Sequence, residues 1–96
     1  MRGLLIDRTL TLRLHPQVAV RPEPFGALLY HFGTRKLSFL KNRTILAVVQ
    51  SLADHPDVGS ALSAAGVAPS QEAPYLHALG VLTDSHMLVP MNGEAP

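Results

Sequence analysis

The spacing of apolar residues changes once along this 96-residue chain, close to residue 42. Before that point apolar and polar side chains alternate, as at Leu10, Leu12 and Leu14, which is typical of strands with one buried face. From Ile45 onward the apolar residues recur at intervals of three and four, which is typical of helices that pack one side onto a core. The change predicts an α+β domain in which a sheet precedes a set of helices.

Three strands are expected in the first half. The first covers 10–21 and is interrupted at His15-Pro16, because proline cannot donate a hydrogen bond to a ladder. The second covers 25–32 and the third 36–40, and Gly33 is expected to supply a positive φ in the loop between them. The connections are short, so the strands should form an antiparallel meander.

Three short helices are expected in the second half, followed by a small wing from residues 81–82 and 87–89. Residue types that favour helix ends mark the boundaries, with N-caps at Asn42 and Asp57 and C-terminal glycines at Gly66 and Gly80. The predicted fold is winged-helix-like, a three-stranded antiparallel β-meander followed by three α-helices.

The length and the composition predict one domain over residues 1–96, with a core at about 10–89 and a flexible tail at 90–96. At 47% hydrophobic residues the chain has enough apolar material for one core. The only continuous apolar run near the N-terminus is Leu4-Leu5-Ile6, which is shorter than a signal-peptide core or a membrane span. Cysteine is absent, which suits a reducing compartment. A cytoplasmic location without membrane association is therefore predicted.

The charges are distributed very unevenly along the sequence. Residues 1–43 contain all eight basic side chains and two acidic ones, a formal charge of +6, whereas residues 44–96 contain five acidic and no basic side chains, a charge of −5. The basic half is expected to attract an acidic partner and to speed its encounter. The alternative is that these charges only solvate two faces of the domain.

No arrangement of residues points to catalysis. The sequence lacks a glycine-rich phosphate loop, and no histidine stands at a helical metal-ligand spacing from another histidine or a carboxylate. The segment Thr83-Asp84-Ser85-His86 has the residues of a catalytic triad, but adjacent residues rarely reach triad geometry, and the composition is that of a turn. We therefore predict no enzyme activity, no cofactor and no metal.

Nucleic-acid binding is the alternative function, because winged helices often read the major groove. The reading helix would be the third one, over 70–79, which carries Glu72 and no Lys or Arg. Such a helix would be repelled by phosphates, so nucleic acid is not expected as a partner.

The third strand, Lys36 to Leu40, is a candidate sheet edge and is flanked by Arg35 and Lys41. An edge strand has unpaired backbone groups, so an extended peptide could add to it as another strand. The same edge could pair with a second copy, giving a homodimer or a strand swap. In the alternative interpretation the apolar residues of this strand and of the third helix are ordinary core.

Three segments carry a resemblance to a known family. They are 21–30 (RPEPFGALLY), 34–40 (TRKLSFL) and 79–82 (LGVL). Over about 10–89 the chain resembles the mycofactocin-system precursor-peptide chaperones, which belong to the PqqD-like recognition elements of ribosomally synthesised, modified peptides. The resemblance implies a PqqD-like fold and a precursor peptide that docks as an added strand beside the third strand, in a groove closed by the third helix. It also implies that a radical S-adenosylmethionine enzyme receives this peptide and modifies its C-terminal Val-Tyr end, while the chaperone performs no chemistry.

These considerations define one expected site and two expected partners. The partners are the precursor peptide and the radical S-adenosylmethionine maturation enzyme. The expected peptide-binding residues are Arg35, Lys36, Leu37, Ser38, Phe39, Leu40, Tyr75, Leu76 and Leu79.

Overall fold

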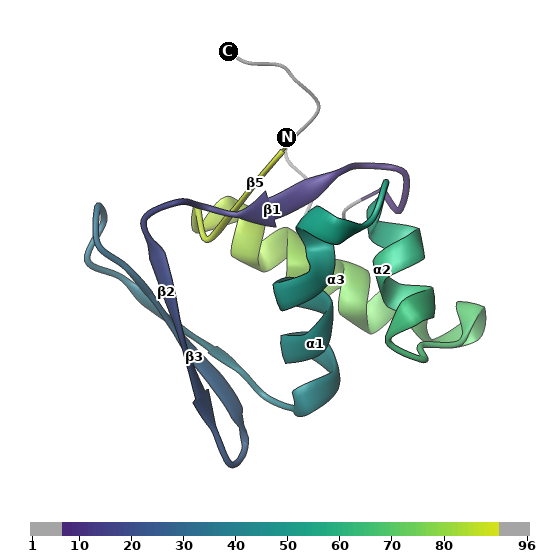
Figure 1. The fold of residues 1–96 in the computed structure, drawn as a ribbon, viewed down its shortest axis with the longest axis horizontal. Helices are drawn as coiled ribbons and strands as arrows, with labels where there is room; N and C mark the ends of the chain where they lie inside the picture. The colour runs from purple at the N-terminus through teal and green to yellow at the C-terminus, as the bar shows by residue number, and fades with distance from the viewer. Residues whose placement is uncertain (1–6, 91–96) are drawn as a thin grey trace.

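The computed structural model describes residues 7–90, which form five strands, three α-helices and two short 3₁₀ helices (Figure 1). In chain order they are β1 (Leu12–Leu14), β2 (Val18–Glu23), β3 (Gly26–His31), β4 (Leu37–Leu40), α1 (Arg43–Ser51), η1 (Leu52–Asp54), α2 (Val58–Ala64), η2 (Pro69–Gln71), α3 (Glu72–Asp84) and β5 (Leu88–Pro90). The expected α+β class and PqqD-like architecture are confirmed. Pro90 is the last residue of β5, and the rest of the expected tail, 91–96, lies outside the described residues.

The antiparallel meander consists of β2, β3 and β4 in that order. A two-residue turn, Pro24-Phe25, joins β2 to β3, so Pro22 and Glu23 belong to the strand rather than to the turn. Gly26 follows the turn with a φ of 153°, and a Cβ there would lie 2.1 Å from the carbonyl oxygen of Leu40. Only glycine allows this close approach of β3 to the end of β4.

The predicted first strand is wrong in one respect, because it divides between two sheets. Val18 donates its amide to the carbonyl of His15 in a turn that separates β1 from β2. β1 then pairs with β5 in a separate two-stranded sheet, in which Leu14 lies opposite Leu88. This pairing joins residues more than seventy positions apart, and no local pattern signals it.

The predicted end of the third helix is also wrong, and of the predicted wing only 88–89 lie in a strand, β5. α3 continues through Gly80, Val81 and Leu82 to Asp84. The helix ends where His86 adopts a left-handed φ of 65°. Met87 then donates to the carbonyl of Leu82 at 2.9 Å and His86 to that of Thr83 at 3.0 Å, as in a Schellman motif.

The two predicted N-caps and the predicted glycine at the end of α2 are confirmed. The side chain of Asn42 accepts the amide of Ile45 at 2.9 Å, and that of Asp57 accepts the amide of Ser60 at 2.8 Å. Each bond satisfies a donor that has no partner within the helix. The bond from Ser60 lowers the pKa of the Asp57 carboxyl. Gly66 ends α2 with a left-handed φ of 87°.

The core lies between one face of the meander and the three helices, which gather on the same side of the sheet (Figure 1). The sheet contributes Ala27, Leu29 and Leu40, and β1 and β5 close the top with Leu12 and Leu88. Helical side chains complete the core, namely Ile45, Val48, Val49, Leu52, Val58, Ala61, Leu62, Leu79 and Leu82. The meander is therefore buried on one face only, as is common for antiparallel sheets.

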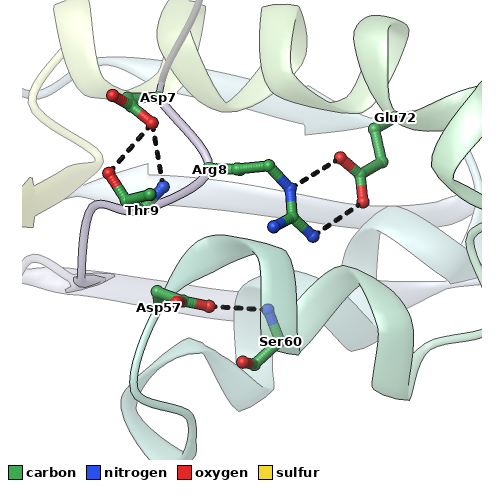
Figure 2. A network of polar contacts seen from close by, with 6 residues as sticks. All are labelled: Asp7, Arg8, Thr9, Asp57, Ser60 and Glu72. Carbon is green, nitrogen blue, oxygen red and sulfur yellow. Dashed lines mark hydrogen bonds and ion pairs between the residues drawn. The ribbon is translucent and has the colours of Figure 1, made fainter.

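The segment before β1 is attached to the helices by an ion pair (Figure 2). The guanidinium of Arg8 donates from Nε to Oε1 of Glu72 at 3.0 Å and from Nη2 to Oε2 at 3.2 Å. The backbone carbonyl of Arg8 also accepts the amide of Gly59 at 2.8 Å. A Cβ at Gly59 would lie 2.5 Å from the guanidinium, so this glycine makes room for the pair.

The loop between β3 and β4 differs from the expectation for Gly33. The left-handed residue in this loop is Arg35, with a φ of 65°, and Gly33 has no positive φ. Gly33 is needed for space instead, because a Cβ there would lie 2.4 Å from the side-chain oxygen of Gln17. The ring of the buried His31 accepts the amides of Gly33 and Thr34 at 3.0 and 3.1 Å and so holds the loop.

Candidate peptide-binding groove

β4 is an edge of the meander, since within the described residues only β3 pairs with it. His31 donates its amide to the carbonyl of Lys36 at 3.0 Å, which fixes the phase of the hydrogen bonds between the two strands. Bonded and non-bonded pairs alternate along an antiparallel ladder, so the backbone groups of Leu37 and Phe39 point away from β3. Apart from bonds within strand ladders, no backbone hydrogen bond described in 7–90 involves either residue. The edge thus offers two donors and two acceptors.

A groove runs between this edge and α3, with a volume of about 510 Å³. Phe39, Leu40 and Lys41 line one wall from the strand side, and the α3 residues Tyr75, Ala78 and Val81 line the other. Ser38, Asn42, Ile45, Pro74 and Leu82 complete the lining. The volume is in the range of ordinary ligand sites, and most of the lining side chains are apolar.

The groove holds few polar groups that could select a ligand by charge. Asn42 uses its side-chain oxygen to cap α1, and Tyr75 is partly buried against the core. Lys41 is exposed and supplies the charge at the groove. The arrangement can therefore bind an extended chain through backbone hydrogen bonds and apolar side chains, with one cationic contact at the end of β4.

The structure brings four of the nine expected site residues into this groove, namely Ser38, Phe39, Leu40 and Tyr75. Leu79 is fully buried in the core, and Leu76 packs partly against it. Leu37 lies on the edge strand, but its side chain does not line the groove.

Arg35 and Lys36 precede the strand, in the loop from β3. Their exposed side chains stand outside the groove lining. These two residues could therefore contact a bound peptide only beyond the N-terminal end of β4.

Sequence reasoning missed seven lining residues, which are Lys41, Asn42, Ile45, Pro74, Ala78, Val81 and Leu82. The α3 members carried a usable signal, because Pro74, Ala78 and Val81 follow each other at helical intervals of four and three. That signal was hidden by the expectation that the helix ends at Gly80. The α1 contribution from Ile45 depends on how the elements pack and has no local signature.

Neither a metal cluster nor a membrane span is found in residues 7–90. No group of three or more His, Asp or Glu side chains there is arranged to hold a metal ion. No helix in the same range is long and apolar enough to cross a membrane.

Comparison with known proteins identifies the family. The family model described as "Peptide chaperone MftB family" matches residues 11–89, which include every strand and helix of the described fold except Pro90 of β5. This chain belongs to the MftB peptide chaperone family. The matched region contains the whole of β4 and α3, so the groove lies within the part of the chain that defines the family. The resemblance of residues 10–89 is confirmed.

Three relatives named "Peptide chaperone MftB" are similar over most of their length. The one from Mycolicibacterium smegmatis is 74% identical over 95% of this chain and 89% of its own. The one from Mycobacterium ulcerans is 80% identical over 85% of this chain and 75% of its own. The one from Mycobacterium tuberculosis is 78% identical over 81% of this chain and 72% of its own. No solved structure matches the MftB-family chain significantly.

Proposed function

We propose that this chain is a non-catalytic peptide chaperone that binds the mycofactocin precursor peptide as an added strand at β4 and presents it to a radical S-adenosylmethionine enzyme. The observation that carries the proposal is the free edge of β4 beside an apolar groove. Membership of the MftB peptide chaperone family supports a peptide as the ligand.

The geometry of the edge favours strand addition over simple insertion of one side chain. Leu37 and Phe39 turn their amides and carbonyls outward, so an added strand forms a ladder with both residues. In such a ladder alternate side chains of the peptide point toward α3. They would enter the space lined by Leu40, Ala78 and Leu82.

A proline substitution tests strand addition directly. Leu37→Pro removes one outward amide, and proline is tolerated at an edge strand where the N–H faces solvent. Leu37→Ala is the matched control, because it removes the same side chain and keeps the amide. We expect Leu37→Pro to lose roughly tenfold more affinity for a synthetic precursor peptide than Leu37→Ala, since a peptide carbonyl is left without its donor. Equal affinities in the two variants, both folded by circular dichroism, would contradict the ladder.

An NMR titration of the isotope-labelled chain with the same peptide tests the location. Shift changes are expected in 37–41 and in the α3 residues 74–82 that line the groove. The absence of shifts at high peptide concentration, with the protein folded, would reduce the role of the groove to a structural one.

The alternative left by the sequence is nucleic-acid binding. α3 contains no Lys or Arg. Of its two acidic residues, Glu72 is buried and held by Arg8, and Asp84 is exposed at the end of the helix. Retention on a polyanion column separates the alternatives, since a phosphate-binding domain elutes late and with a steep dependence on salt. We expect weak retention.

A further inference from the structure

The face of the meander turned away from the helices carries an unusual number of exposed aromatic side chains. All three phenylalanines of the protein are there, with Phe25 49%, Phe32 59% and Phe39 61% exposed. Phe39 and Leu37, which is 54% exposed, project from β4, and Tyr30 and Leu28 lie opposite them on β3. We call these six residues the aromatic face: Phe25, Leu28, Tyr30, Phe32, Leu37 and Phe39.

The side chains of the aromatic face contact one another, but these contacts do not bury them. Phe25 and Phe39 have ring centroids 6.2 Å apart, and Tyr30 meets Phe32 edge to face at 5.1 Å. Such cross-strand contacts stabilise a sheet. They still leave about half of each phenylalanine open to solvent, and within residues 7–90 no helix or loop covers this side of the sheet (Figure 1). Contiguous apolar patches rimmed by polar residues mark interaction surfaces.

The charge on the segments that form the aromatic face is mostly positive. Residues 18–40, the strands and loops that bear the aromatic face, carry three basic side chains and one acidic one, a formal charge of +2. Arg21 shares this face with Leu28, its partner in the register, and its side chain is 77% exposed. The acid is Glu23, which already pairs with Arg21 at 3.2 Å. Two copies meeting through this face would bring like charges together, which disfavours self-association and favours an acidic partner.

The aromatic face is continuous with the edge at which we propose that the peptide binds. Side chains on a strand point alternately to the two faces of the sheet. A peptide strand added to β4 would send one half of its side chains into the groove and the other half outward beside Leu37 and Phe39. Its outward side chains would extend the aromatic face by one strand.

We infer that the aromatic face is the docking surface for a second protein whose own surface has an apolar centre and an acidic rim, and which contacts the bound peptide together with the chaperone. The inference rests on the proposed function for the identity of the peptide, but the surface itself is argued from exposure and charge. Aromatic anchors at the centre of an interface carry much of the binding energy, and steering by a charged rim speeds association.

Serine substitutions at the two phenylalanines that do not line the groove test the inference. The probe is the purified radical S-adenosylmethionine enzyme of the proposed function, titrated into the full chain with and without the synthetic precursor peptide. We expect Phe25→Ser and Phe32→Ser each to weaken enzyme binding at least about tenfold and to leave peptide binding unchanged. Both side chains are half exposed, so the variants should fold.

One variant in the groove and two charge-reversal variants complete the design. Val81→Ser lies in the groove, so it should weaken peptide binding and leave binding of the enzyme to the peptide-free chain intact. Arg21→Glu should weaken enzyme binding, whereas Arg43→Glu, which changes the net charge equally from the start of α1, should not.

The outcomes separate the two proposals. Unchanged enzyme affinity in both phenylalanine variants, or no enzyme binding by the unsubstituted chain, would overturn the docking surface. A dimer in sedimentation that either serine substitution dissociates would overturn it as well, because a second copy would then be the occupant. Enzyme binding that depends on Phe32 in a chain with no affinity for the peptide would support the docking surface and refute the proposed function.

Discussion

The guanidinium of Arg8 forms a two-bond ion pair with Glu72, at 3.0 and 3.2 Å, across sixty-four residues of sequence. The carboxylate is buried, whereas the Arg8 side chain is half exposed. The hydrogen bonds that Arg8 donates to Glu72 raise the pKa of Arg8, so the guanidinium keeps its charge. This contact ties the segment before β1 to the first turn of α3 and hence to one wall of the groove.

Arg8→Met should lower the thermal unfolding temperature, because it leaves a buried carboxylate without its cation. Arg21→Met is the control, since the pair of Arg21 with Glu23 is exposed and should contribute less than about 1 kcal/mol. Adding Glu72→Leu to Arg8→Met should restore part of the lost stability. Equal unfolding temperatures for Arg8→Met and Arg21→Met would mean that the buried end of the pair is well solvated.

The two tyrosines of the chain offer a matched comparison of the two surfaces. Tyr75 lines the groove and Tyr30 lies on the aromatic face. Tyr75→Ala should weaken binding of the precursor peptide by about 1–2 kcal/mol, measured by calorimetry, whereas Tyr30→Ala should not change it. A loss of helical signal in Tyr75→Ala would assign that residue to the core instead.

His15 should make the stability of the domain depend on pH. Burial, the neighbouring His31 ring at 4.4 Å, and the charges of Arg13 and His86 lower the pKa of His15 below 6.5. The folded state therefore binds a proton less readily than the unfolded state. The contribution to stability is complete above about pH 6.5 and is lost as the pH falls through the lowered pKa.

In the unsubstituted chain the amide of Gln17 donates to the His15 ring at 3.0 Å. His15→Asn removes the titration and keeps an acceptor for this amide. The free energy of unfolding of this variant should fall less between about pH 7 and pH 5 than that of the unsubstituted chain. The control for the change from histidine to asparagine is His77→Asn, at an exposed position of α3. Identical profiles for all three proteins would mean that His15 is solvated like a free histidine.

Two glycines with positive φ differ in the space around them, which predicts different costs for alanine. Gly66→Ala meets open space and should cost about 1 kcal/mol of stability through backbone strain alone. Gly26→Ala should cost more, because its Cβ would also approach the Leu40 carbonyl to 2.1 Å. Chemical denaturation of both variants checks the order, and a smaller effect at Gly26 would show that β4 can move away from β3.

Salt should slow peptide association if the basic half steers an acidic segment toward the groove. The Debye length falls from about 30 Å to about 3 Å between about 0.01 M and 1 M salt. The association rate constant in stopped-flow measurements should fall over this range, while the dissociation rate constant changes much less. An association rate constant that does not depend on salt would show that the basic half does not steer the peptide.

The elements that local sequence predicts are the ones whose ends are marked by local hydrogen bonds. Asn42, Asp57 and Gly66 were identified correctly, because a cap depends on residues within a few positions. The pairing of β1 with β5 was missed, since it joins distant segments and neither strand exceeds three residues. The length of α3 was missed because a histidine, His86, holds the left-handed position that glycine usually takes.

The candidate site was predicted in outline, and its lining was predicted in part. The edge strand was expected from its short connections and its flanking charges. Leu79 was expected to contact the peptide but lies fully in the core, and Val81 was placed in a wing but lines the groove. Which face of a helix turns toward a groove depends on the packing of α1 and β4 against it, and that packing has no signature in one helix alone.

The outward amides of Leu37 and Phe39 stand two residues apart. This spacing restricts the register in which any added strand can pair with β4. A bound peptide can slide only in steps of two residues, about 7 Å, without exchanging the side chains in the groove for those outside it. A shift by a single residue inverts the whole pattern. If a peptide adds to β4 as proposed, the number of residues between its docked segment and a distant reacting end would therefore be restricted to either even or odd values.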